Sequence, residues 1–334
     1  MSGARRLTTG GLIDRSHSIS FHFNGKRYSG HPGDTLASAL LAQGVRLFGR
    51  SFKYHRPRGV IGAGSEEPNA LVQVGEGAHS TPNLRATQVE LYQGLTARTV
   101  NGWPSLAYDL GSVNNWFGRL LPAGFYYKTF MWPRSAWMRY EHYIRKAAGL
   151  GHAPSGPDPD HYDKRHCHCD VLVVGSGPAG LMAALGAARS GARVILADEQ
   201  ARLGGSLLHA SVQIGGKTAV DWVGEVLTEL HTYPEVTLLK RSTVAGYYDH
   251  NFLTINERRT HHQGPGQSDP RISRERLWRV RARQVILATG AIERPLVFSG
   301  NDTPGVMLAS AVSTYVRRYA VAPGQCGAVF TNND

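Results

Sequence analysis

Residues 171–180 read Val-Leu-Val-Val-Gly-Ser-Gly-Pro-Ala-Gly, a short apolar strand that runs directly into three spaced glycines. In a Rossmann-like βαβ unit, the first glycine makes the tight turn and the second lets a pyrophosphate approach the backbone. The third glycine lets helix and strand pack closely, and the helix N-terminus offers unpaired N–H groups to phosphates. The stretch therefore predicts a dinucleotide-binding turn formed by Gly175, Ser176, Gly177, Pro178, Ala179 and Gly180.

Three neighbouring features support this prediction. Residues 171–174 are all apolar, as expected of a parallel strand that is covered on both faces. Residues 181–189 are rich in alanine and leucine, which favours a helix. The acidic pair Asp198-Glu199, followed by Gln200, begins 23 residues after the first glycine, close to the offset of about 20 expected for the acid that receives the ribose hydroxyls.

Later segments extend the same α/β unit, for which we expect a three-layer architecture. Residues 236–239, 243–248 and 252–255 read as strands, with a turn between the last two. Residues 284–290 form another apolar strand that ends in small residues, which lets the chain pass beside the dinucleotide. The further site residues that we predict from these segments are Gly205, Ser206, Thr243, Val244, Ala288, Thr289 and Gly290.

The identity of the nucleotide stays open at the level of single residues. An acid at the ribose disfavours a 2′-phosphate, which argues against NADP. NAD and FAD both carry an adenosine with a free 2′-hydroxyl, so the glycine turn does not distinguish them.

The N-terminal segment predicts a second, smaller domain over residues 16–95. Apolar and polar residues alternate over 19–23, and Asn24-Gly25 is a strong hairpin turn. Asp34 or Thr35 is placed to cap a helix that runs through Ala42. A hairpin followed by a helix in this order indicates a β-grasp, ferredoxin-like α+β fold.

Length and composition agree with a two-domain protein. The chain has 334 residues, of which 41% are hydrophobic, enough for two cores. No apolar run reaches about 18 residues, so we expect no membrane span. Three cysteines indicate a reducing compartment and a cytoplasmic protein. The net charge of +12 is dispersed in pairs such as Arg317-Arg318. We therefore expect no nucleic acid, and we expect the acidic partner to be a phosphate-bearing cofactor, another subunit or the missing half of the chain.

Residues 96–165 read as an aromatic-rich connector and linker. Ten aromatic residues lie between 115 and 143, and we expect them to pack the domains together or to dock a partner subunit. The dinucleotide-binding domain is predicted to span 166–323. Residues 324–334 read as the start of a truncated second nucleotide-like domain, with a strand at 328–331.

The sequence His166-Cys167-His168-Cys169 resembles a metal-binding motif, but we do not expect it to bind a metal ion. Neighbouring residues on an extended chain point to opposite faces, so these four side chains do not converge on an ion. No nucleophile with an adjacent base is evident, and we assign no catalytic residue. Hydride chemistry is expected to come from a cofactor, with the protein supplying position and electrostatics.

Several longer stretches resemble a known family. The glycine turn, the acidic strand end, the pair Gly204-Gly205 and the sequence Ala288-Thr289-Gly290 occur in the order typical of the two-dinucleotide-binding flavoprotein superfamily. Residues 50–59 (Arg-Ser-Phe-Lys-Tyr-His-Arg-Pro-Arg-Gly), 127–131, 291–295 and 298–307 (Phe-Ser-Gly-Asn-Asp-Thr-Pro-Gly-Val-Met) resemble the α subunit of heterotetrameric sarcosine oxidase. The resemblance covers nearly the whole chain.

This resemblance implies a function and a set of partners. It implies NAD in the site predicted here, with FAD as the alternative, and a flavin, FMN or FAD, on a partner subunit. It also implies β, γ and δ subunits and the oxidative demethylation of sarcosine to glycine, with O2 as oxidant. The products would be hydrogen peroxide and either 5,10-methylenetetrahydrofolate or formaldehyde.

The small domain also resembles plant-type [2Fe–2S] modules of related amine and opine dehydrogenases. Such modules hold the cluster with four cysteine thiolates, and residues 1–166 contain no cysteine. Gly49, Gly62, Gly64 and Asn69 stand in the loop where ligands would be sought. We therefore expect the fold without an iron–sulfur cluster.

Two other functions remain open. One is an FAD-dependent amine dehydrogenase subunit of the hydrogen cyanide synthase or opine oxidase kind. The other is a non-catalytic assembly subunit whose nucleotide does not turn over.

Overall fold

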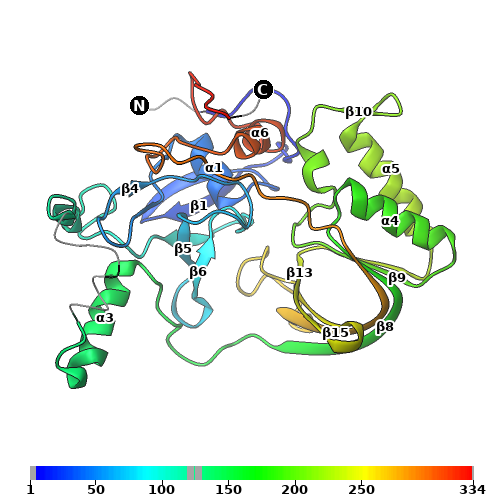
Figure 1. Ribbon diagram of the computed structural model, residues 1–334, viewed down its shortest axis with the longest axis horizontal. Helices are drawn as coiled ribbons and strands as arrows, with labels where there is room; N and C mark the ends of the chain where they lie inside the picture. Colours follow the sequence, from blue (N-terminus) through cyan, green and yellow to red (C-terminus); the bar gives the residue numbers. More distant parts are fainter. Residues whose placement is uncertain (1–4, 119–123, 125–129, 333–334) are drawn as a thin grey trace. The chain divides into compact units, whose positions relative to one another are not determined.

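A computed structural model describes residues 5–118, 124 and 130–332 (Figure 1). The chain forms two compact units. The first comprises Met1–Asp158 together with Glu293–Asp334, and the second comprises Pro159–Ile292. The second unit ends well before residue 323, so the division differs from the predicted domain boundaries.

The first unit is built on a five-stranded sheet in the order β2-β1-β7-β5-β6. β1 (Ile19–Phe23) and β2 (Lys26–Gly30) form the expected hairpin. Asn24 and Gly25 join them with φ of 50° and 76°, the left-handed pair that a two-residue hairpin turn requires. β7 (Thr96–Arg98) lies parallel to β1, which is the arrangement of a β-grasp fold.

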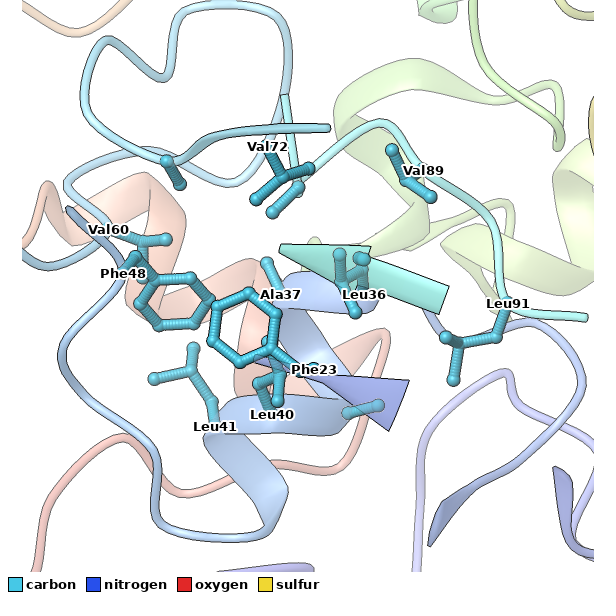
Figure 2. Packing of buried hydrophobic residues seen from close by; sticks show 14 of the residues in the cluster. Phe23, Leu36, Ala37, Leu40, Leu41, Phe48, Val60, Val72, Val89 and Leu91 are labelled. Carbon is cyan, nitrogen blue, oxygen red and sulfur yellow. The ribbon is translucent and has the colours of Figure 1, made fainter. Parts of the chain in front are cut away.

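One helix, α1 (Leu36–Ala42), covers this sheet and begins at a capping box. The backbone N–H of Ser38 donates to the Thr35 hydroxyl at 3.2 Å, and the Ser38 hydroxyl accepts from the Thr35 N–H at 2.9 Å. All seven residues of α1 are buried. In Figure 2, side chains of α1 meet the neighbouring rings of Phe23 and Phe48, whose centroids lie 6.4 Å apart.

The remaining elements of the first unit are short. They are β3 (Gly49–Arg50), β4 (Pro57–Arg58), β5 (Leu71–Val74), η1 (Gly77–His79), β6 (Thr81–Arg85), η2 (Leu110–Asn115), η4 (Arg134–Ala136), α3 (Trp137–Ala148) and α6 (Ala309–Arg317).

The connector holds exposed aromatic side chains in its described part. Trp103, Trp116 and Trp132 are 69%, 83% and 84% exposed, so these three do not serve to pack a core. The predicted segment 127–131 lies partly outside the described residues, as do Phe125, Tyr126 and Tyr127.

The C-terminal segment belongs to the first unit. Tyr315 on α6 is completely buried in the β-grasp core, and its hydroxyl donates to the Gly62 carbonyl at 3.1 Å. The strand predicted at 328–331 is wrong, because these described residues pair with no other strand. An apolar run becomes a strand only when a neighbour supplies its hydrogen bonds.

The second unit is an α/β domain with a six-stranded sheet in the order β12-β9-β8-β15-β14-β13. The first four strands of this order are parallel. β8 (Tyr162–Val174) and β15 (Glu275–Leu287) run side by side over their whole length (Figure 1). The other strands are β9 (Val194–Ala197), β12 (Val236–Leu239), β13 (Ser242–Tyr248) and β14 (Phe252–Arg258), with the small pair β10 (Gln213–Ile214) and β11 (Lys217–Thr218).

Two cores lie on the two faces of this sheet. The adjacent residues Leu172 and Val173 of β8 belong to different hydrophobic clusters, because successive side chains of a strand point to opposite faces of the sheet. Val173 packs with α4 (Pro178–Arg189) and α5 (Ala219–His231). Leu172 packs with side chains of β9, β14 and β15. The predicted Rossmann-like α/β domain preceded by a β-grasp domain is confirmed.

Candidate dinucleotide site

The glycine turn after β8 closes as the sequence predicts. Gly175 has a φ of 98°, a left-handed conformation that favours glycine. A Cβ on Gly175 would lie 2.3 Å from the Ala288 carbonyl oxygen, and a Cβ on Gly180 would lie 1.9 Å from the Gly175 carbonyl oxygen. Gly175 and Gly180 are therefore required because backbone carbonyl oxygens of the protein itself lie where a side chain would be.

Gly177 differs from the other two glycines. Its φ of −65° and ψ of −177° suit any residue, and no described atom lies within 4 Å of a Cβ placed there. Gly177 is the N-cap of α4, Pro178 is its first residue, and no described side chain caps the helix. The open space and the N–H groups of Ala179 and Gly180 together form a cradle that fits a pyrophosphate.

Asp198 is engaged in holding this turn together. Its carboxylate accepts from the Ser176 N–H at 2.8 Å, from the Ser176 hydroxyl at 2.6 Å and from the Gln200 N–H at 2.8 Å. The buried Ser176 hydroxyl also accepts from the Gly204 N–H at 3.0 Å. One carboxylate thus links the glycine turn, the end of β9 and the Gly-Gly loop.

From the sequence, Asp198 and Glu199 are both predicted to receive the ribose hydroxyls, but in the structure the two residues make different contacts. The backbone carbonyl of Glu199 accepts from Arg258 Nη2 at 2.8 Å, and Glu199 is half-buried. Arg258 Nε is buried without a partner among the described residues. Sequence reasoning missed Arg258, because a basic residue near the end of a strand is an ordinary surface pattern.

The Gly-Gly loop lies against the turn. Gly204 has a φ of 133°, and Gly205 begins the short helix η5 (Gly205–Leu208), which includes Ser206. A Cβ on Gly205 would lie 2.8 Å from the Gly177 Cα. The structure therefore brings together two glycine-rich segments that are 28 residues apart in sequence.

The last two predicted groups also reach this end of the sheet. The Ala288 N–H donates to the Val174 carbonyl at 2.8 Å, which places Ala288 beside the turn and leads to exposed Thr289 and Gly290. The Ser242 N–H donates to the Asp198 carbonyl at 2.7 Å. Thr243 and Val244 follow Ser242 on β13, so they start from the same strand end.

The His-Cys motif lies on β8, away from the turn. Cys169 is 3% exposed, and burial raises the pKa of its thiol to about 12. Burial raises the pKa of Cys167 as well. Thiols in this state are poor nucleophiles and poor metal ligands. In the described part of the chain, no three His, Cys, Asp or Glu side chains are grouped as metal ligands would be.

The two units define the class of protein. Residues 16–102 match the family described as 2Fe-2S iron-sulfur cluster binding domain, and residues 170–274 match the family described as FAD dependent oxidoreductase. The chain therefore combines a ferredoxin-like domain with an FAD-dependent oxidoreductase domain.

The relatives identify the particular protein family that the chain resembles. It is 55% identical over 331 residues to the alpha subunit of sarcosine oxidase from Rhizobium meliloti (strain 1021), covering 98% of this chain and 33% of the relative. It is 41% identical over 342 residues to the alpha subunit of sarcosine oxidase from Corynebacterium sp. (strain U-96), covering 100% of this chain and 30% of the relative. The chain is thus a homologue of sarcosine oxidase alpha subunits and spans about a third of their length, so the predicted resemblance is confirmed.

One solved structure supports the fold. L-proline dehydrogenase from P. horikoshii aligns with a TM-score of 0.62 over 96% of this chain and 50% of that chain, at 20% identity. The shared architecture includes both units.

The cofactor expectation is wrong in two respects. The family match over 170–274 is to an FAD-dependent domain, so FAD, the alternative named above, takes the place of NAD. The match over 16–102 is to a 2Fe–2S cluster-binding family, which contradicts the expectation of no iron–sulfur cluster. That expectation rested on cysteine count alone, whereas family membership follows the whole pattern of the fold.

The donor atoms of the matched small domain do not fit thiolate ligation. Residues 16–102 contain no cysteine. The loop that contains Gly62, Gly64 and Asn69 is where cluster ligands would be sought. There the buried carboxylate of Glu67 accepts from the N–H groups of Ile61 at 2.7 Å, Gly62 at 2.8 Å, Asn69 at 2.7 Å and Ala70 at 3.2 Å. We assign this loop no step in the chemistry.

Described helices of the protein are all too short or too polar to cross a membrane.

Proposed function

We propose that this chain is the FAD-binding part of the alpha subunit of a sarcosine oxidase complex. The complex would convert sarcosine, water and O2 to glycine, hydrogen peroxide and formaldehyde, or would pass the one-carbon unit to tetrahydrofolate as 5,10-methylenetetrahydrofolate. The observation that carries the proposal is the open cradle at Gly177 in an FAD-dependent oxidoreductase domain. The 55% identity to a named alpha subunit supports the choice of substrate.

Each part of the site has a distinct task. The N–H groups at the start of α4 bind the pyrophosphate, and the helix dipole favours its negative charge. Asp198 positions the turn through Ser176 and Gly204. Glu199 receives the ribose hydroxyls, while Gly205, Ser206, Thr243, Val244 and the residues 288–290 line the remaining surface. When bound, FAD supplies the two-electron acceptor for oxidation of the amine.

The same reasoning extends to partners and location. The relatives carry the name of one subunit of an assembly, which supports a complex with β, γ and δ subunits. We propose a cytoplasmic heterotetramer in which this chain alone is inactive, because no catalytic constellation occurs in its described part.

A second candidate is an amine dehydrogenase subunit of the opine oxidase kind. One of the opine oxidase subunits of Agrobacterium tumefaciens (strain Ach5) is 32% identical over 160 residues, which covers 46% of this chain and 30% of the relative. The match to the sarcosine oxidase relatives is longer and closer, so we place the opine oxidase function second.

Release of the cofactor from the purified protein with its co-purifying subunits tests the proposal. The supernatant of the heat-denatured protein should contain FAD, identified by chromatography and mass. Sarcosine, but not an opine, should then reduce the flavin of the assembly. Release of NAD without flavin, or reduction by opines alone, would contradict the proposal.

A further inference from the structure

The His-Cys motif and the basic residues of β15 form one surface. Because β8 and β15 pair in register, side chains at alternate positions share a face. His166 lies opposite Arg279, His168 opposite Arg281, and Lys164 opposite Leu277. The intervening residues Cys169, Trp278, Val280 and Ala282 are buried on the other face. We call Lys164, His166, His168, Arg279 and Arg281 the cationic sheet face.

Most of these side chains are open to solvent. Lys164, His166, His168 and Arg281 are exposed, and Arg279 is half-buried. Arg279 Nη1 lies 3.4 Å from His166 Nε2, so two groups that can both carry positive charge face each other across the strands.

The charges of this face form no ion pairs among the described residues. Over residues 5–118, 124 and 130–332, the structure places no carboxylate within ion-pair distance of Lys164, Arg279 or Arg281. The acids at the two ends of the face are already engaged. Glu275 lies 2.8 Å from His261 Nε2, and Asp170 lies 3.0 Å from Arg193 Nη2. Like charges on paired strands destabilise a sheet by up to about 1 kcal/mol per pair.

Aromatic side chains on the next strands complete the surface. Phe252 on β14 pairs with Arg281, whose guanidinium lies 5.3 Å from the centre of the Phe252 ring. Tyr248 is 56% exposed, and its ring centre lies 5.9 Å from that of Phe252. Arginine and aromatic residues together are typical of the central contacts of protein interfaces.

We propose that the cationic sheet face docks an acidic surface of a partner protein chain. The proposal rests on the proposed function in one respect, since it takes the chain to be a subunit of an assembly. Charge complementarity carries it: in the described part of the chain, Lys164, Arg279 and Arg281 have no acid within ion-pair distance, and the protein has a net charge of +12. Tyr248 and Phe252, beside the face, belong to the residue type enriched at protein interfaces, and we take the partner to be a protein.

Zero-length carbodiimide cross-linking of the purified assembly tests the contact. Lys164 should become joined to an aspartate or glutamate of another chain, identified by mass spectrometry. Lys26, which is exposed on β2, serves as the matched control and should not be joined in this way. Absence of any link from Lys164 to another chain, or a link only to an acid of its own chain, would overturn the proposal.

Charge variants test its energetics. Arg279→Gln with Arg281→Gln should weaken assembly by about tenfold at low salt, and by less at high salt, because screening already reduces the attraction. Arg271→Gln is the control, since Arg271 is 88% exposed and paired with Asp269. Unchanged assembly of the double variant would overturn the proposal, as would tight, salt-sensitive binding of a single-stranded DNA 20-mer that competes with assembly. FAD content is measured in parallel: its absence from the wild type would refute the proposed function alone.

Discussion

The second and third glycines of the turn should respond in opposite ways to the same substitution. In Gly180→Ala, the new methyl group would lie 1.9 Å from the Gly175 carbonyl oxygen and 3.3 Å from the Ala288 Cβ. Backbone atoms cannot move aside as a flexible side chain would, so we expect a loss of about 3 kcal/mol. For a domain of this size, that corresponds to a fall of about 10 °C in Tm.

Gly177→Ala should leave the apoprotein intact. The position has a conformation open to alanine and free space around the Cβ, so the free energy of unfolding should stay equal or rise by up to about 1 kcal/mol. The methyl group would instead fill the cradle for the pyrophosphate. A steric cost of about 1–3 kcal/mol in the complex corresponds to a loss of roughly tenfold to a hundredfold in affinity.

Two measurements on the wild type, Gly177→Ala and Gly180→Ala separate the effect on stability from the effect on FAD binding. Thermal unfolding of the apoproteins reports the fold, and titration with FAD, followed by flavin fluorescence, reports binding. The reasoning would be refuted if Gly177→Ala bound FAD with wild-type affinity, or if the two variants lost the same amount of stability.

Three further predictions concern other parts of the chain. Asp198→Asn should lower the Tm of the apoprotein, because hydrogen bonds to a charged acceptor contribute about 1.5–3 kcal/mol each. Glu199→Gln should lower the affinity for FAD without changing the Tm. Equal Tm values in the two apoproteins would contradict the assignment of separate roles. Thr35→Ala should cost about 1 kcal/mol in chemical unfolding through loss of the α1 capping box, and an unchanged midpoint would show that the cap contributes nothing. Arg193 lowers the pKa of Asp170 from 3.8 to about 2, so this pair stabilises the fold above about pH 4 and the contribution is lost as the pH falls toward 2; Asp170→Asn should flatten that part of the curve of Tm against pH, and a curve identical to that of the wild type would exclude the pair as a cause.

Local patterns could be read from the sequence because local physics produces them. The apolar run 171–174, the three glycines and the turn Asn24-Gly25 each fix their structure through neighbours in the chain. The strands at 236–239 and 243–248 were predictable for the same reason, since short apolar or β-branched runs between turn residues have few alternatives.

Long-range contacts could not be read in this way. The hydrogen bonds from Asp198 to Ser176 span 22 residues, and they decide that Asp198 positions the turn. Tyr315 joins α6 to a core built some 250 residues earlier, which moves the unit boundary to Ile292. The first half of β8 is polar and gave no strand signal, and it is a strand because β15 pairs with it over its whole length.

A density map of the purified assembly with its native cofactor tests the central claim most directly. We predict FAD, with its phosphates within hydrogen-bond distance of the backbone N–H groups at the start of α4, beside Gly177. A flavin bound elsewhere, with the space above Gly177 filled by protein side chains, would contradict the claim.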